Sequence, residues 1–211
     1  MIALGVLASG RGSNLQAIID ACEAGRLDAR PAVVISDNPR AQALERAARH
    51  GVPAVVVERR ASKSRDDYER VIVASLREHA VDLVCLAGYR RLVGRVLLDA
   101  FPWRVMNIHP ALLPSFPGLE AQRQALEYGV KVAGCTVHFV DEGADSGPVI
   151  LQKPVPVLEG DDVESLSERI LEQEHQVYPE AIALYAAGRL KVAGRRVHIL
   201  GEGKEPWPDV H

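Results

Sequence analysis

The N-terminal segment Ile2-Ala3-Leu4-Gly5-Val6-Leu7-Ala8-Ser9-Gly10-Arg11-Gly12-Ser13-Asn14 decides the fold class of this chain. Its first part, residues 2–8, is a continuous apolar run, which is typical of a strand buried on both faces of a parallel sheet. A glycine turn follows, and apolar residues then recur at helical spacing at Leu15, Ile18, Ile19 and Cys22. Strand, glycine turn and helix in this order direct free backbone N–H groups and a helix N-terminus toward one point. This arrangement favours the binding of an anion at that point.

The glycine turn itself predicts a phosphate site. Gly10 and Gly12 allow close backbone approach, while Ser13 and Asn14 can cap the helix and also hydrogen-bond a phosphate. The turn is not a P-loop, because it lacks the Gly-Lys-Ser/Thr sequence, and Leu15 stands where a dinucleotide fingerprint has its third glycine. One phosphate monoester is therefore favoured over a dinucleotide, with a plain helix cap as the alternative.

The following hundred or so residues alternate between strand and helix patterns. Strands are expected at 32–36, 54–57 and 83–87, and helices at 41–50 and from Arg65 onward. Such alternation implies right-handed crossovers and a mostly parallel sheet. We therefore expect an α/β, Rossmann-like three-layer fold.

The C-terminal half predicts an antiparallel extension of that sheet. Extended runs at 132–140 and 149–157 flank an acidic loop that is too long for a tight hairpin turn. A helix is expected from Asp161 or Asp162, kinked or broken at Pro179. A hairpin at 190–200 follows, and residues 201–211 are expected to be a flexible tail.

Composition excludes several classes of function. The chain has 211 residues, 47% of them apolar, which predicts one domain. Its net charge of -3 gives no reason to expect non-specific attraction to nucleic acid or membranes. No signal-peptide pattern and no apolar run of roughly 20 residues is present. Cys22, Cys85 and Cys135 lack the number and spacing of a disulfide framework or zinc site, which favours a cytoplasmic protein without a metal.

A second polar site is predicted in the segment 105–118. Asn107 and His109 end an apolar strand, lie two residues apart and therefore point to the same side, and prolines follow them. At the carboxyl edge of a parallel sheet both side chains would face the ligand crevice. Asn107 could donate to an oxyanion and His109 could exchange a proton, although a buried histidine bonded to a backbone carbonyl is the alternative.

The acidic loop 141–148 could bring a carboxylate beside His109. Such a pair would raise the pKa of the imidazole and favour the imidazolium as a proton donor, whereas a solvated loop is the alternative. Arg90 and Arg91 follow the strand at 83–87 and could pair with a carboxylate at the same crevice, or form a solvated turn. His138 is interpreted as scaffold or as a residue that supports a catalytic side chain without contacting substrate, because it lacks the neighbouring donor that Asn107 gives His109.

Four motifs together resemble the phosphoribosylglycinamide formyltransferase family: Ser-Gly-Arg-Gly-Ser-Asn-Leu at 9–15, Leu-Ala-Gly-Tyr at 86–89, Asn-Ile-His-Pro at 107–110 with Leu-Leu-Pro at 112–114, and Asp-Ser-Gly-Pro at 145–148. The resemblance extends from residue 1 to about residue 195. It implies the formyltransferase fold and transfer of the formyl group of 10-formyltetrahydrofolate to the amine of 5-phosphoribosylglycinamide in purine biosynthesis. It also implies that no metal and no tightly bound cofactor takes part.

The resemblance assigns roles to individual residues. The catalytic group is Asn107, His109 and Asp145, with Asn107 and a protonated His109 stabilising the oxyanion while Asp145 keeps His109 charged. Ribonucleotide-binding residues are Gly12, Ser13, Asn14, Leu15 and Glu174. Folate-binding residues are Arg65, Arg90, Arg91, Leu92, Val93, Asn107, Asp141 and Asp145. Arg90, where relatives more often have Met, and Leu171, where they often have a long polar residue, depart from the family pattern.

The resemblance also predicts the organisation of the chain. A single formyltransferase domain is expected at 1–200, with a phosphate-binding half at 1–100 and a folate-binding and catalytic half at 101–200. Small molecules are the expected partners of a monomer or weak homodimer. Formyltetrahydrofolate hydrolase is an alternative, although it carries an additional N-terminal domain, and methionyl-tRNA formyltransferase adds an RNA-binding domain. A non-catalytic folate- or nucleotide-binding protein would not need the catalytic group.

Overall fold

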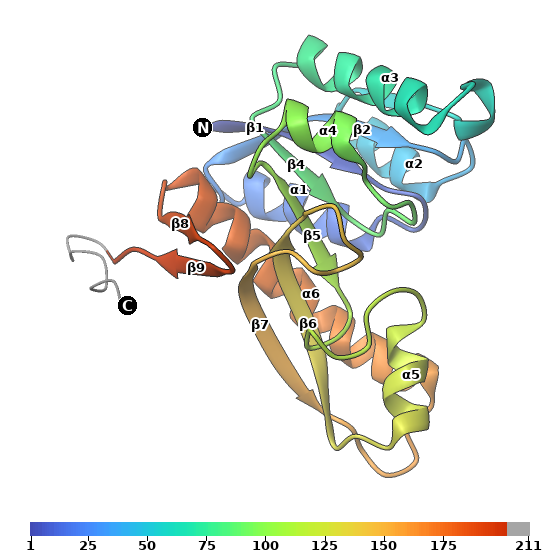
Figure 1. Cartoon of the computed structure of the whole chain (residues 1–211), viewed down its shortest axis with the longest axis vertical. Helices are drawn as coiled ribbons and strands as arrows, with labels where there is room; N and C mark the ends of the chain where they lie inside the picture. Colours follow the sequence, from blue (N-terminus) through green and yellow to red (C-terminus); the bar gives the residue numbers. More distant parts are fainter. Residues whose placement is uncertain (202–211) are drawn as a thin grey trace.

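The computed structural model describes residues 1–201, so nearly all of the expected tail at 201–211 lies outside the described residues. Within this part, one sheet has the strand order β3-β2-β1-β4-β5-β6-β7-β9-β8 (Figure 1). The first five strands along the chain, which pair in parallel, are β1 (Ile2–Leu7), β2 (Ala29–Ser36), β3 (Ala54–Val56), β4 (Leu83–Leu86) and β5 (Val105–His109). The predicted parallel sheet is confirmed.

The second half of the chain extends this sheet with antiparallel strands, as predicted. β6 (Val132–Phe139) pairs antiparallel with β5 and with β7 (Val149–Pro156). β8 (Leu190–Ala193) and β9 (Arg196–Ile199) form the expected hairpin, which joins β7 through a single parallel pair. The acidic loop therefore connects two neighbouring antiparallel strands, and it leaves β6 beside the first residues of β5.

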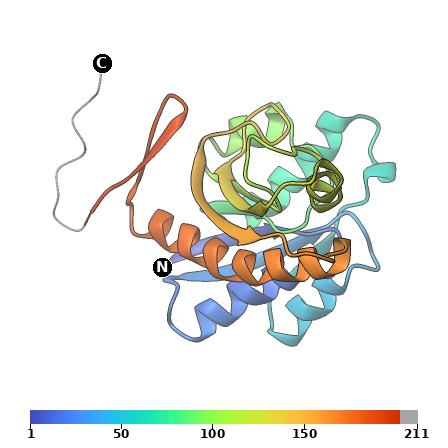
Figure 2. The same ribbon diagram turned by 90° about the horizontal axis from the view of Figure 1, so that it is seen from below.

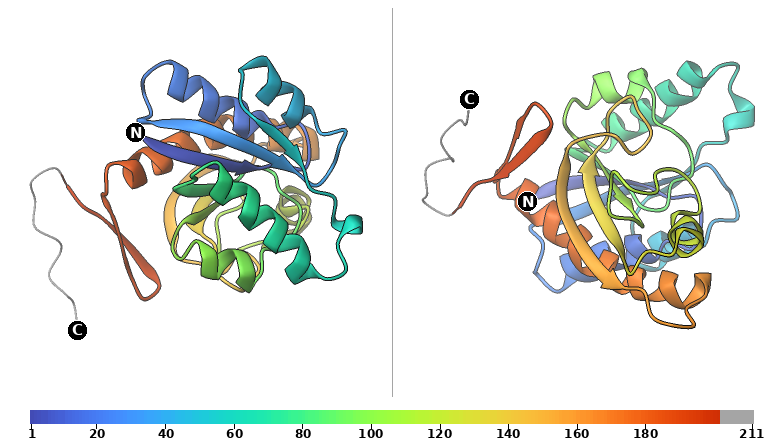
Figure 3. Two further views of the ribbon diagram at one scale, coloured as in Figure 1. Left: turned by 90° about the horizontal axis from the view of Figure 1, so that it is seen from above. Right: turned by 60° about the horizontal axis from the view of Figure 1, so that its bottom comes forward.

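Helices cover both faces of the sheet and make the fold three-layered (Figures 2 and 3). Buried residues of α1 (Ser13–Glu23), α2 (Gln42–Arg49) and α6 (Val163–Ala186) join one hydrophobic core. Those of α3 (Arg65–Glu78) and α4 (Arg95–Ala100) join the core on the opposite face, whereas α5 (Ala121–Tyr128) packs near α6. The apolar run of β1 lies between the two cores, which explains its burial on both faces.

Two helices differ from the sequence predictions. Pro179 does not break α6, which begins after the predicted N-cap Asp162 and continues to Ala186. Packing explains this result, because the residues around the proline, including Val177 and Tyr178, are fully buried and offset the lost backbone hydrogen bond. The short helix α4 had no predicted counterpart, since its six residues are too few to show a clear periodicity.

The segments that follow β1 and β4 are joined by direct hydrogen bonds. The Ser9 N–H donates to the Gly88 carbonyl at 3.2 Å, and the Arg90 N–H donates to the Ser9 hydroxyl at 3.1 Å. From α6, the buried Tyr178 hydroxyl lies 3.1 Å from the carbonyl oxygens of both Leu86 and Met106. Because Leu86 also pairs with Leu7 and with Asn107 in the register of the sheet, the glycine turn and Asn107 lie along one edge. In residues 1–201, no helix has the length and apolar character needed to cross a membrane.

Candidate active site

The glycine turn is built from a left-handed glycine backbone and not from a side-chain cap. Gly12 is the N-cap of α1 with φ +70°, and a Cβ there would lie 2.8 Å from the Cα of Ala43 in α2. The cap forms no side-chain hydrogen bond, so the prediction that Ser13 or Asn14 caps the helix is wrong. The first N–H groups of α1 therefore remain directed at the turn, as an anion site requires.

Asn14 does not cap the helix because its side chain turns toward α6. Its Nδ2 donates to Oε2 of Glu174 at 2.7 Å, and both side chains are buried. Among the described residues, Asn14 Oδ1 has no hydrogen-bond partner. Burial raises the pKa of Glu174 to about 7, although the bond from Asn14 acts in the opposite direction. The pair thus presents acceptor oxygens that a ligand with hydroxyl or N–H donors could satisfy.

Asn107 and His138 form a cross-strand pair at the end of β5. They are directly opposite in the β5–β6 register, and Asn107 Nδ2 lies 3.1 Å from His138 Nε2. His138 Nδ1 lies 2.9 Å from the Phe139 carbonyl, which only accepts, so Nδ1 carries the proton and Nε2 accepts from Asn107. The expectation that His138 lacks a neighbouring donor is therefore wrong, and its interpretation as scaffold or as a supporting residue stays a prediction. The sequence could not reveal this pair, because it depends on the register of two strands.

Asp145 connects these residues to His109. Its Oδ2 accepts from the Gly118 N–H at 2.8 Å and lies 3.4 Å from His109 Nδ1. Its Oδ1 is 3.4 Å from Asn107 Nδ2 and 3.7 Å from His138 Nε2. We call Asn107, His109, His138 and Asp145 the polar cluster. The structure thus brings together the three residues predicted as a catalytic group and adds a second imidazole.

The protonation states in the polar cluster differ from the prediction. Burial lowers the pKa of His109 and outweighs its hydrogen bond to Phe116 and the charge of Asp145, both of which raise it. The predicted increase in the pKa of His109 is therefore wrong in net direction, although the contribution of Asp145 has the predicted sign. For Asp145, burial raises the carboxyl pKa, but His138, the Gly118 N–H and His109 together lower it. The free protein near pH 7 therefore combines a neutral His109 with an ionised Asp145.

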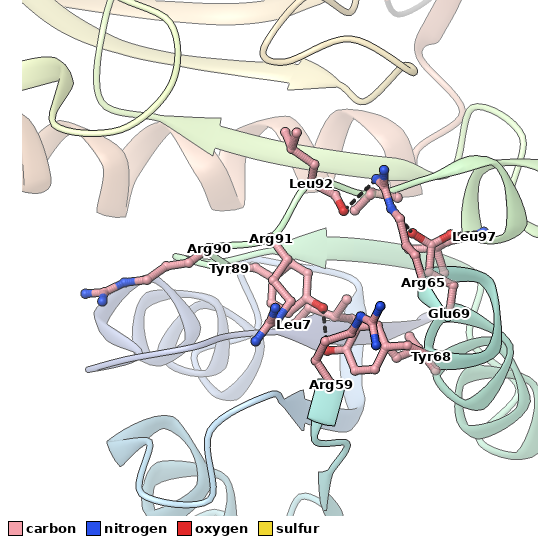
Figure 4. Close-up of a pocket in the computed structure, with 12 residues that line it drawn as sticks. Leu7, Arg59, Arg65, Tyr68, Glu69, Tyr89, Arg90, Arg91, Leu92 and Leu97 are labelled. Atoms are coloured by element: carbon pink, nitrogen blue, oxygen red, sulfur yellow. Dashed lines mark hydrogen bonds and ion pairs between the residues drawn. The ribbon is translucent and has the colours of Figure 1, made fainter. Parts of the chain in front are cut away.

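The expected folate-binding residues divide among three places. Arg65, Arg90, Arg91, Leu92 and Val93 line a cavity of about 370 Å³, together with Tyr68, Tyr89 and other residues (Figure 4). Asp141 is not in this lining, and its Oδ1 accepts from the Ser146 hydroxyl at 2.6 Å and from the Gly143 N–H at 3.1 Å, which orders the acidic loop. Asn107 and Asp145 also lie outside the lining and belong to the polar cluster.

The arginines of this cavity differ in their contacts. Arg91 Nε lies 2.6 Å from Asp37 Oδ2, so the chain itself supplies the carboxylate that the sequence analysis expected at this edge. Its guanidinium also lies over the Tyr68 ring at 5.8 Å from the centroid. Arg65 Nε lies 3.2 Å from Glu69 Oε1, whereas Arg90 points away from the other labelled side chains (Figure 4). In the described part of the chain, no cluster of three or more His, Cys, Asp or Glu residues could hold a metal ion.

Comparisons with known proteins identify a family. Residues 3–182 match the family described as formyl transferase. A phosphoribosylglycinamide formyltransferase of Bacillus subtilis (strain 168) is 45% identical over 177 residues, which are 84% of this chain and 91% of the relative. The chain belongs to the formyl transferase family.

Solved structures of family members agree in fold. Glycinamide ribonucleotide transformylase 1 from Symbiobacterium toebii is 61% identical, with a TM-score of 0.94 and 95% of each chain covered. A formyltetrahydrofolate deformylase from Pseudomonas syringae pv. tomato is 27% identical, with a TM-score of 0.87, and the match covers 95% of this chain and 66% of the deformylase. The formyltransferase fold expected from the sequence is confirmed, and the deformylase is the more distant relative.

Proposed function

We propose that this chain is a phosphoribosylglycinamide formyltransferase. It transfers the formyl group of 10-formyltetrahydrofolate to the amine of 5-phosphoribosylglycinamide, which yields formylglycinamide ribonucleotide and tetrahydrofolate. The observation that carries this proposal is the polar cluster, in which one carboxylate contacts the amide of Asn107 and the imidazole of His109. A protein that only binds folate or a nucleotide would not need these three groups in contact.

In this proposal His109 carries protons between the two substrates. Attack by the amine forms a C–N bond to the formyl carbon, and collapse of the intermediate breaks the bond to N10 of the folate. The amine nitrogen loses one proton and N10 gains one. A neutral His109 is the form that can accept the proton from the amine. Asp145, at 3.4 Å from Nδ1, stabilises the imidazolium that results. The imidazolium then donates a proton to N10 of the folate.

Asn107 is proposed to stabilise the oxyanion of the intermediate. His138 fixes the orientation of the amide by accepting one Nδ2 proton at 3.1 Å. The contact of Nδ2 with Asp145, at 3.4 Å, is the longer of the two. An oxyanion could replace Asp145 as the acceptor from Nδ2, while the hydrogen bond from Nδ2 to His138 stays in place. Removal of a single donor of this kind typically costs about 100- to 1,000-fold in turnover.

The remaining expected site residues are proposed to hold the two substrates. The phosphate of the ribonucleotide would accept hydrogen bonds from first-turn N–H groups of α1, at Gly12, Ser13, Asn14 and Leu15. The carboxylate of Glu174 would accept hydrogen bonds from hydroxyl or N–H groups of the ribonucleotide. The folate would bind in the cavity and extend to the acidic loop and the polar cluster. Its proposed contacts are Arg65, Arg90, Arg91, Leu92, Val93, Asn107, Asp141 and Asp145. The division into a phosphate-binding half at 1–100 and a folate-binding and catalytic half at 101–200 stays a prediction. These assignments depart from it, because Glu174 lies in the second half and Arg65 and residues 90–93 lie in the first.

No tightly bound cofactor is proposed, since 10-formyltetrahydrofolate acts as a co-substrate. We further propose a monomer or weak homodimer that works in the cytoplasm. The cysteines Cys22, Cys85 and Cys135 are free thiols.

The test is formyl transfer by the purified chain, measured as tetrahydrofolate release with and without 5-phosphoribosylglycinamide. We expect release that requires the amine and yields one formylated ribonucleotide per tetrahydrofolate. Release without the amine would identify a hydrolase, like the deformylase relative. No release, with binding of either substrate retained, would identify a binding protein.

A further inference from the structure

Glu69 is a buried acidic residue of α3 that lies outside the polar cluster and the glycine turn. Its side chain is 5% exposed, and its carboxylate faces the segment between β4 and α4. Three N–H donors converge on it: the backbone N–H of Gly94 at 2.6 Å, the backbone N–H of Leu97 at 3.3 Å, and Nε of Arg65 at 3.2 Å. A buried carboxylate with this set of donors is satisfied by one neighbouring segment and its own helix.

The two backbone bonds make Glu69 the N-terminal cap of α4. The N-cap of this helix is Gly94, which has no side chain and forms no cap bond of its own. A carboxylate from α3 takes that place and also meets the positive end of the helix. Gly94 is fitted to this arrangement, because a Cβ there would lie 2.8 Å from Oε1 of Glu69.

The same contacts fix the wall of the cavity. Arg65, held by Glu69, donates from Nη2 to the Leu92 carbonyl at 2.8 Å, so the chain is held at Leu92 and again at Gly94 (Figure 4). Leu92, Val93 and Leu97 line the cavity on one side, and Glu69 and Arg65 line it from α3. One carboxylate therefore sets the position of both sides.

We propose that Glu69 is a positioning residue for the folate co-substrate, which acts by holding the Leu92–Gly94 backbone and the Arg65 guanidinium in a binding conformation. The inference rests on the proposed function and adds to it a residue that need not contact the folate. It predicts a selective effect: loss of Glu69 weakens folate binding, while the glycine turn and the polar cluster keep their geometry.

Glu69→Gln is the decisive variant. An amide has one acceptor oxygen, so its NH₂ group must face at least one of the three donors, and the shape of the side chain is otherwise kept. Glu78→Gln, at an exposed position of the same helix, is the matched control. For each protein, kcat and the KM values of both substrates are measured, together with the Kd of 10-formyltetrahydrofolate without the amine.

We expect Glu69→Gln to raise the KM and Kd for the folate about tenfold, the size expected for a lost hydrogen bond to a charged group. The KM for 5-phosphoribosylglycinamide and kcat should stay within roughly twofold, and Glu78→Gln should match the wild type. An unchanged folate Kd, or an equal rise in both KM values, would overturn the proposal.

Three further outcomes are decided in advance. If Glu69→Gln does not fold, Gly94→Ala displaces the same carboxylate from the other side, and the absence of a folate-selective loss in that variant overturns the proposal. If the wild type transfers no formyl group, the proposed function fails, whereas the ratio of folate Kd values still tests Glu69. A wild type that does not bind the folate overturns both.

Discussion

The glycine turn consists of consecutive residues, whereas the polar cluster gathers side chains from β5, β6 and the acidic loop. In the turn, the important groups are backbone N–H donors, and Gly12 matters for its φ of +70° and its close approach to α2. In the cluster, the important groups are titratable side chains, whose contacts depend on the pairing of Asn107 with His138. Substitutions should therefore affect the turn through conformation and binding, and the cluster through proton transfer.

The largest effect is expected in the polar cluster. His109→Ala removes the proposed proton carrier, so kcat should fall by about 100- to 10,000-fold, the typical contribution of a general acid–base group. Affinity for the ribonucleotide should change little, because His109 does not contact the glycine turn. Steady-state kinetics and ribonucleotide titration check both parts, with His198→Ala on β9 as a control. A variant that keeps wild-type kcat would refute the role of His109.

The matching substitution in the turn is Gly12→Ala. It combines a left-handed backbone with a contact of 2.8 Å to Ala43, so we expect about 3 kcal/mol of destabilisation and weaker ribonucleotide binding. Gly25→Ala is the control, because Gly25 has a similar φ of +67° and open space around its Cα. Thermal unfolding and ribonucleotide titration compare the two variants. Equal losses in both would show that close approach to α2 has no importance.

Glu174, the buried partner of Asn14 in the glycine turn, should make the stability of the protein depend on pH. Its pKa of about 7 exceeds the model-compound value of 4.5, so the folded state binds more protons than the unfolded state between these values. The free energy of unfolding should therefore fall as the pH rises from about 5 to 8, by about 2 to 3 kcal/mol attributable to Glu174. Denaturant unfolding of the wild type and Glu174→Gln at both pH values measures this difference. Parallel pH curves for the two proteins would contradict the prediction.

Local patterns in the sequence predicted the turn and most of the fold, since each depends on neighbouring residues. Features set by contacts between distant segments were predicted less well. The side chain of Asn14 bonds to Glu174 of α6 instead of capping its own helix α1. Arg91 pairs with Asp37, which lies far from it in the sequence. The proximity of Asp145 to His109 was anticipated, but burial, which no local pattern reveals, reversed the expected net shift in the pKa of His109.

The smallest predicted effect separates the two imidazoles of the polar cluster. His138→Gln removes the acceptor that orients the Asn107 amide, and the substitute can rotate to present either an oxygen or an NH₂ group. We expect kcat to fall about tenfold, because Asn107 would spend less time in the proposed oxyanion-stabilising orientation. His109 would remain to carry the proton, so the pH profile should keep the shape of the wild type. A loss as large as that of His109→Ala, or a changed profile, would show instead that His138 exchanges protons during the reaction.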